Sequence, residues 1–160
     1  MLRIGQSSDI HRFKPGDYLV IGGEVIKACY GCDAHSDGDA LVHAIAEAIL
    51  GALALGDIGT HFPDTDERYH NINSLELLAE VSNLMHQQGY EIVNIDSLIL
   101  IEKVKMAPYI NKMQANLASV LNIDINQVSV KATRGEKMGF IGHEEGFAAQ
   151  AVVLLQNENQ

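Results

Sequence analysis

The sequence has no long apolar run, and this shortage limits what the protein can be. Its longest apolar stretch, residues 44–55, is interrupted by Glu47 and Gly51 and is too short to span a bilayer. The N-terminus has neither the basic-then-apolar pattern of a signal peptide nor the Arg- and Ser-rich pattern of a transit peptide. We therefore expect a cytoplasmic protein with no membrane partner.

Basic residues are also scarce. The 160 residues include 11 Lys and Arg against 21 Asp and Glu, which gives a formal net charge of −10. Such a chain is not expected to bind nucleic acid or an anionic membrane surface. A carboxylate and a phosphate charge about 4 Å apart repel by roughly 4 kcal/mol at an effective dielectric near 20. A phosphorylated substrate would therefore need cations placed at its site.

Cysteine is limited to Cys29 and Cys32, which have the spacing of zinc knuckles and thiol redox centres. No second pair completes a four-thiolate site, and the flanking residues lack the strand-to-helix setting of a thioredoxin-like motif. One interpretation is a mixed metal site with His35. The other is a pair of reduced cysteines in a loop, as the expected compartment favours.

The length and the order of patterned segments predict one domain, residues 1–160, of the α+β class. We expect a mixed sheet of the four-stranded type, with helices packed on one face and an N-terminal hairpin. The hairpin turns at Gly22-Gly23. The other expected elements are an extended segment up to residue 14, a helix through His43 to about 55, a loop at 57–66, helices at 74–88 and 108–121, and strands at 92–101, 128–133 and 147–155.

Asp9, His11 and His43 offer one carboxylate and two imidazoles. On a strand, residues two apart point to the same face, so Asp9 and His11 can converge on one ion. His43 lies on the first expected helix, which Ser36 or Asp39 can cap. One acid and two imidazoles suit a catalytic zinc that keeps one coordination position open. The alternative is a polar turn and an ordinary helix histidine.

Several further segments could contribute to such a site, although each also has a simpler interpretation. Glu47 lies one turn after His43, so we predict that it accepts a hydrogen bond from the imidazole nitrogen that does not bind metal. Residues 57–66 could hold the hydroxyls of a small polyol or form an acidic surface loop. Residues 133–137 could cradle a diphosphate, with Glu136 holding a divalent cation, or form a charged turn. Residues 103–108 could read a base edge or simply lead into a helix.

In this order and spacing, the motifs resemble the family of 2-C-methyl-D-erythritol 2,4-cyclodiphosphate synthases over nearly the entire chain. The matching segments include Asp9-Ile10-His11, 34–39, 54–59, 62–66, 130–133, 136–140 and Glu145-Gly146. The resemblance implies a cyclising phosphorus-oxygen lyase of the non-mevalonate isoprenoid pathway. In that reaction the 2-phosphate of 4-diphosphocytidyl-2-C-methyl-D-erythritol 2-phosphate attacks the β-phosphorus, CMP leaves, and a cyclic diphosphate forms.

The resemblance also implies roles for individual residues. Zn²⁺ would be held by Asp9, His11 and His43, and Mg²⁺ or Mn²⁺ by Glu136. His35 and Thr133 would position the transition state. The implied substrate contacts are His35 and Ser36 at the 2-phosphate, Asp57 and Gly59 at the erythritol hydroxyls, Phe62, Asp64 and Asp66 at the pocket border, Ile101, Lys105, Met106 and Ala107 at cytosine, Thr133 at the α-phosphate, and Arg134, Phe140 and His143 nearby.

The family is a homotrimer, so the resemblance implies active sites between subunits, with the cytidine side from one chain and most zinc ligands from its neighbour. Three positions depart from the familiar pattern. Glu47 stands in place of an aspartate, and Arg134-Gly135 stands in place of a threonine pair. His143 stands where an arginine often binds an anionic isoprenoid at the trimer axis, so any such binding should be weaker or pH-dependent.

Two functions of other classes stay open. In a zinc phosphohydrolase the open metal position would activate water, but the sequence offers no well-placed general base beside that water. In a non-catalytic binding or scaffold protein the metal would only staple the chain together.

Overall fold

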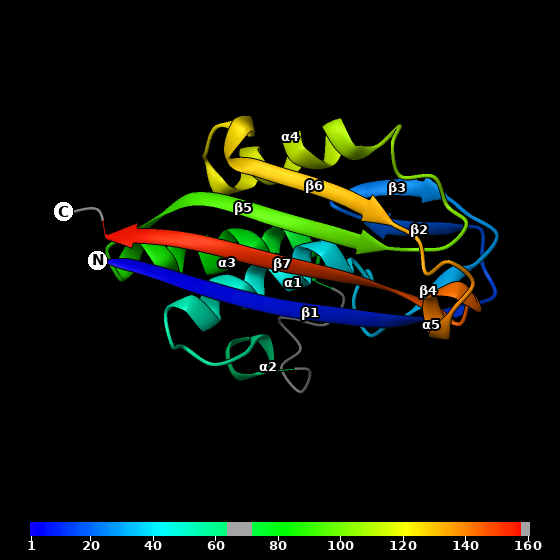
Figure 1. The fold of residues 1–160 in the computed structure, drawn as a ribbon. Helices are drawn as coiled ribbons and strands as arrows, with labels where there is room; N and C mark the ends of the chain where they lie inside the picture. Colours follow the sequence, from blue (N-terminus) through cyan, green and yellow to red (C-terminus); the bar gives the residue numbers. More distant parts are fainter. Residues whose placement is uncertain (64–71, 158–160) are drawn as a thin grey trace.

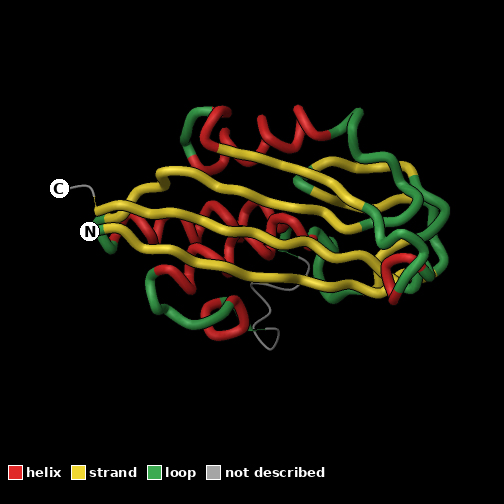
Figure 2. Tube along the Cα trace, in the orientation of Figure 1, coloured by secondary structure: helices red, strands yellow, loops and turns green. Residues whose placement is uncertain are grey.

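A five-stranded mixed sheet forms the centre of the chain in a computed structural model, which describes residues 1–63 and 72–157 (Figures 1 and 2). The strand order is β4-β1-β7-β5-β6, and the strands are β1 (Leu2–Lys14), β4 (Gly31–Asp33), β5 (Tyr90–Leu100), β6 (Val128–Thr133) and β7 (Gly146–Asn157). The α+β class is confirmed. The sheet has one strand more than expected, because the short β4 pairs with the end of β1. The three residues of β4 are too few to show the alternating pattern from which a strand is predicted.

The long strands run between the two ends of the molecule. β1 and β7 pair antiparallel from Leu2–Gln156 to Arg12–Gly146. β7 also pairs antiparallel with β5, whereas β5 and β6 are parallel. The last residues of β1, β5 and β6 and the first of β7 therefore lie at one end of the sheet, on the right in Figure 1.

Helices cover one face of this sheet. α1 (Ala40–Ala52) lies against β1 and β7, and α3 (Ser74–Gln87) packs on α1 and β5. α4 (Ile110–Leu121) packs beside β6 and against α3; in Figure 1, α1 and α3 lie behind the sheet, and α4 lies along its upper edge. α1 is buried nearly all round because it lies between the sheet and α3. No helix in the described ranges is long and apolar enough to cross a membrane.

The predicted hairpin is confirmed as β2 (Tyr18–Ile21) and β3 (Glu24–Lys27), with Gly22 and Gly23 at positive φ in the turn. The buried Asp39 carboxylate accepts hydrogen bonds from both glycine amides, at 2.9 and 2.7 Å, and from Val42 N at 3.1 Å. Burial raises the pKa of Asp39 to about 6, against the lowering effect of these amides. Asp39 is thus the N-cap of α1 and ties the hairpin to it.

Other element boundaries differ modestly from expectation. α1 ends at Ala52, before the expected residue 55, and Ala54 and Gly56 then adopt positive φ. α4 begins at Ile110 rather than Pro108, with Tyr109 as its N-cap. Three short helices occupy segments expected to be loops: α2 (Ile58–His61), η2 (Ile125–Gln127) and α5 (Gly139–Gly142). Single turns of helix carry too few residues for a hydrophobic period to reveal them.

Candidate metal centre and its surroundings

Asp9, His11 and His43 come together as predicted. β1 directs Asp9 and His11 toward the helix side of the sheet, and the first turns of α1 bring His43 to them. The Asp9 Oδ2 atom lies 3.1 Å from His11 Nε2 and 3.2 Å from His43 Nδ1. The potential ligand atoms of the three residues all lie within 4.8 Å of one another, and all three residues are half-buried.

The geometry of this triad fits a divalent transition metal. His11 Nε2 is buried and has no well-directed hydrogen bond, although the Asp9 oxygen is only 3.1 Å away. Both imidazole nitrogens face the same carboxylate oxygen, so a cation between them would satisfy all three atoms. Nitrogen and carboxylate donors in this number suit zinc with one position left for another ligand. Among the described residues, this is the one group that gathers three such donors.

The opposite charges of Asp9 and His11 stabilise each other. Burial disfavours the charged form of His11, but its contacts with the Asp9 carboxylate and the Cys32 thiol outweigh burial and raise the pKa to about 10. Burial also favours the neutral form of Asp9, yet the two imidazoles hold the pKa of that carboxyl well below its usual range. At neutral pH, His11 and Asp9 therefore form an ion pair.

Metal binding should displace the proton of His11. Because a pKa of about 10 keeps His11 protonated at pH 8, and because imidazole binds metal only through a deprotonated nitrogen, Zn²⁺ uptake by chelator-stripped protein should release about one proton from this residue. Isothermal titration calorimetry in buffers of different ionisation enthalpy measures that release. His11→Gln is the matched control and should release fewer protons. A binding heat independent of the buffer would contradict the prediction.

The predicted contact between Glu47 and His43 is wrong. Glu47 Oε2 instead accepts a hydrogen bond from Ser7 Oγ at 2.8 Å. With its Nδ1 toward Asp9, His43 has its Nε2 3.0 Å from the hydroxyl of Ser74, the first residue of α3. The spacing of one helical turn places Glu47 and His43 on the same side of α1. The orientation of the His43 ring, however, depends on its contacts with β1 and α3.

The segment between β4 and α1 lies beside the triad. His35 is exposed, and Ser36 is half-buried with its Oγ accepting a hydrogen bond from Gly38 N at 3.2 Å. Cys32 is part of β4 rather than a loop, and its thiol contacts His11 and lies 3.8 Å from the Gly38 carbonyl oxygen. Gly38 has φ +76°, and a Cβ there would lie 2.6 Å from Cys32 Sγ. Both cysteines are free thiols, and the mixed site with His35 does not form among the described residues.

A separate cavity brings the four predicted cytosine residues together with Thr133, predicted at the α-phosphate, and Arg134. Ile101, Lys105, Met106, Ala107, Thr133 and Arg134 all line a cavity of about 220 Å³. The parallel pairing of β5 and β6 creates it, because Leu100 pairs with Thr133 and Ile101 N donates to Thr133 O at 3.0 Å. None of the triad residues lines this cavity.

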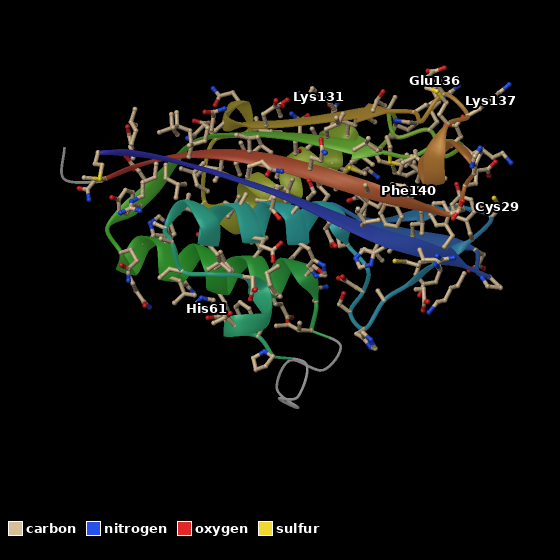
Figure 3. All side chains as sticks on the ribbon, turned by 60° about the horizontal axis from the view of Figure 1, so that its bottom comes forward. Cys29, His61, Lys131, Glu136, Lys137 and Phe140 are labelled. Atoms are coloured by element: carbon tan, nitrogen blue, oxygen red, sulfur yellow. The ribbon has the colours of Figure 1, made fainter. Side chains whose placement is uncertain are left out.

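Glu136 and Lys137 come shortly after Thr133 and Arg134, which line that cavity. Figure 3 shows Glu136 and Lys137 at the same end of the molecule as Phe140 and Cys29. Both are exposed and both have positive φ, 52° and 63°, which is unusual for residues with a Cβ. Glu102 Oε2 accepts a hydrogen bond from Gly135 N at 2.9 Å and so holds the loop. Consecutive residues in such backbone conformations often mark functional loops.

The remaining predicted residues are more dispersed. Asp57 is exposed and caps α2, accepting hydrogen bonds from Thr60 N at 2.9 Å and Thr60 Oγ1 at 2.8 Å, and these bonds lower its pKa. Gly59 is exposed on α2, and Phe62 after it is buried. Phe140 lines a different cavity, of about 310 Å³, and His143 is exposed at the end of α5. Asp64 and Asp66 lie outside the described residues.

Comparison with known proteins gives a consistent result. A family model described as the YgbB family matches residues 2–156. A protein of Chlorobaculum tepidum named 2-C-methyl-D-erythritol 2,4-cyclodiphosphate synthase is 51% identical over 156 residues, which cover 98% of this chain and 99% of that protein. The structure of IspF from Plasmodium falciparum in complex with CDP matches with a TM-score of 0.88 and 37% identity, covering 99% of this chain and 97% of that one. The structure of bifunctional IspDF from Campylobacter jejuni matches with a TM-score of 0.93 and 39% identity; the match covers 100% of this chain but only 44% of that longer chain.

Proposed function

The chain belongs to the YgbB family, and from this premise we propose that it converts 4-diphosphocytidyl-2-C-methyl-D-erythritol 2-phosphate into 2-C-methyl-D-erythritol 2,4-cyclodiphosphate and CMP. The observation that carries the proposal is the triad of Asp9, His11 and His43, whose ligand atoms converge in a half-buried site. We further propose that the protein is a zinc-dependent, cyclising phosphorus-oxygen lyase that acts as one domain. The relatives that bear the synthase name support this reaction, and the complex of IspF with CDP supports a cytidine nucleotide as ligand.

The reaction is an intramolecular phosphoryl transfer. A 2-phosphate oxygen forms a bond to the β-phosphorus. The bond between the β-phosphorus and the oxygen that it shares with the α-phosphorus breaks, and CMP leaves with that oxygen and the electron pair. When bound, zinc would supply Lewis-acid charge neutralisation at a β-phosphate oxygen. The protein must then align the attacking phosphate and the leaving group in line, because alignment and charge neutralisation account for most of the catalysis in such a step.

The residues around the triad suit these tasks. His35 and Ser36 are proposed to bind the 2-phosphate, and Asp57 and Gly59 to bind the erythritol hydroxyls. The cavity lined by Ile101, Lys105, Met106 and Ala107 is proposed to hold cytosine. Thr133 and Arg134 line the same cavity, so Thr133 can reach the α-phosphate of a nucleotide bound there. His35 and Thr133 would then hold opposite ends of the reacting group.

A second divalent cation, Mg²⁺ or Mn²⁺, is proposed for Glu136. Its carboxylate is exposed, next to the loop that follows the cytosine cavity, and Lys137 beside it adds a positive charge. Magnesium usually keeps several waters and binds through one or two carboxylates together with substrate phosphates. A single glutamate at the diphosphate position meets that requirement.

A homotrimer with sites between subunits is the proposed assembly. The sheet face without helices carries apolar side chains: Gly5 faces α1, so the alternating Ile4 and Ile10 face the other way, and they are 72% and 59% exposed. Val152 pairs with Gln6 on the same face and is 40% exposed. The cytosine cavity also shares no residue with the triad. A neighbouring subunit that covers this face and brings its own cavity to the triad would explain both features.

Product analysis tests the reaction. Incubation of the substrate in H₂¹⁸O, followed by phosphorus NMR and mass spectrometry, should give CMP and a cyclic diphosphate with two coupled phosphorus signals and no ¹⁸O, because no water takes part. A zinc phosphohydrolase would instead give CMP and a linear product with two uncoupled phosphate monoesters, and one of the two products would contain ¹⁸O from the attacking water. That outcome would contradict the cyclase assignment.

A further inference from the structure

Asp37 and Ser74 form a partly buried hydrogen-bonded pair behind the metal centre, on the side of His43 away from Asp9. Ser74 is the first residue of α3 and is fully buried, and Asp37 is half-buried in the segment before α1. One Asp37 oxygen accepts a bond from Ser74 N at 2.9 Å, and the other accepts from the Ser74 hydroxyl. The second oxygen also accepts from Asp39 N at 3.1 Å.

We propose that Asp37 and Ser74 act as a positioning pair for His43. Ser74 contacts the imidazole directly, Asp37 acts through Ser74, and together they fix the ring orientation and tautomer of His43 for metal binding. The argument depends on where each proton lies. An ionised carboxylate can only accept hydrogen bonds, so the hydroxyl proton of Ser74 is committed to Asp37. The Ser74 oxygen, 3.0 Å from His43 Nε2, must then accept from that nitrogen.

In the neutral imidazole, which is the form that binds metal, this assignment leaves the other nitrogen of His43 unprotonated. With the proton on Nε2, the lone pair of Nδ1 faces Asp9 Oδ2 at 3.2 Å. A lone pair and a carboxylate oxygen that face each other repel unless a cation lies between them. The pair therefore selects the form of the imidazole that binds metal, as carboxylate partners of metal-ligating histidines do elsewhere.

The surroundings explain why two residues do this rather than one. Ser74 is fully buried, so water cannot easily replace its hydroxyl as the acceptor for His43. The Asp37 carboxylate lies at the first turn of α3, where backbone amides favour a negative charge. Asp37 also joins α3 to the segment that carries His35 and Ser36, so the pair connects the proposed phosphate contacts to the metal ligand. The proposal depends on the metal centre but not on the identity of the reaction.

Metal affinity measured by chelator competition tests the proposal without reference to turnover. Ser74→Ala should weaken Zn²⁺ binding by about 10- to 100-fold, the usual effect of removing such a partner. In the Co²⁺-loaded protein it should also shift the visible absorption bands, because the imidazole geometry changes. Ser82→Ala is the matched control: Ser82 is a buried serine further along the same helix, and none of the described hydrogen bonds and ion pairs of the triad involves it. It should leave both readouts unchanged.

Asp37→Asn and the double variant complete the test. Asp37→Asn should weaken Zn²⁺ binding in the same direction, and the double variant should lose little more than Ser74→Ala alone, because the two residues act in series. The proposal is overturned if Ser74→Ala binds Zn²⁺ within twofold of Ser82→Ala, or if the two effects simply add. Should Ser74→Ala fail to fold, the proposal is overturned if Asp37→Asn binds Zn²⁺ within twofold of Ser82→Ala. A protein with normal affinity and no cyclase activity would contradict the proposed reaction and not this inference.

Discussion

Asp9→Ala should abolish metal binding and lower turnover by a factor of about 10³ or more. Both imidazole nitrogens face the same Asp9 oxygen, at 3.1 and 3.2 Å, so its removal takes away a ligand and the charge that opposes the cation. Metal ions supply several kcal/mol of transition-state stabilisation in reactions of this kind, and each 1.36 kcal/mol corresponds to about tenfold in rate. Elemental analysis of the purified protein and the rate of CMP release measure the two effects.

Glu47→Gln is the matched control for Asp9→Ala. Glu47 carries an acidic group nearby but bonds Ser7 rather than a triad residue, and a glutamine can keep that bond. This variant should retain metal and turnover. Sedimentation equilibrium should give the mass of three chains for the unchanged protein and for both variants. If Asp9→Ala instead unfolds, the metal is a structural staple, and the non-catalytic alternative is the better description.

Gly5→Ala should lower the free energy of unfolding by about 3 kcal/mol or more, near or above the upper end of typical overpacking effects. β1 approaches α1 so closely at Gly5 that an added Cβ would lie 1.9 Å from the Ala48 carbonyl oxygen and 2.8 Å from Ala52 N. These are backbone atoms of a buried helix, so neither can move without shifting α1. Urea unfolding of chelator-stripped protein measures the change.

Gly51→Ala is the control for Gly5→Ala, because the same methyl group is added to the same strand–helix layer without a clash. Nothing lies within 4 Å of a Cβ at Gly51, which is exposed in the last turn of α1. Alanine should therefore raise the free energy of unfolding by about 0.5–1 kcal/mol, through its higher helix propensity. Equal stabilities of the two variants would contradict the close packing of β1 on α1.

Local patterns were sufficient to predict much of the candidate site. Residues two apart on a strand share a face, so Asp9 and His11 were expected to converge, and the structure brings them together. The Gly22-Gly23 turn and the Asp39 cap were predictable for a similar reason, since each depends on backbone geometry within a few residues. The grouping of the cytosine residues was predicted from the resemblance rather than from local pattern, and the parallel pairing of β5 and β6 that brings them to one cavity was not predicted.

Long-range packing determined the features that local patterns did not predict. The short strand β4 exists only because it pairs with the end of β1, and a pattern of three residues is too short to predict it. Glu47 lies one turn from His43 along the chain, yet the ring of His43 is held between Asp9 on β1 and Ser74 on α3, which is 31 positions away. The hydrogen-bond partners of a half-buried imidazole depend on which elements pack around it, and that is a property of the assembled layers. The amino-acid order specifies which donors and acceptors exist, and the packing of α1 between the sheet and α3 determines which of them meet.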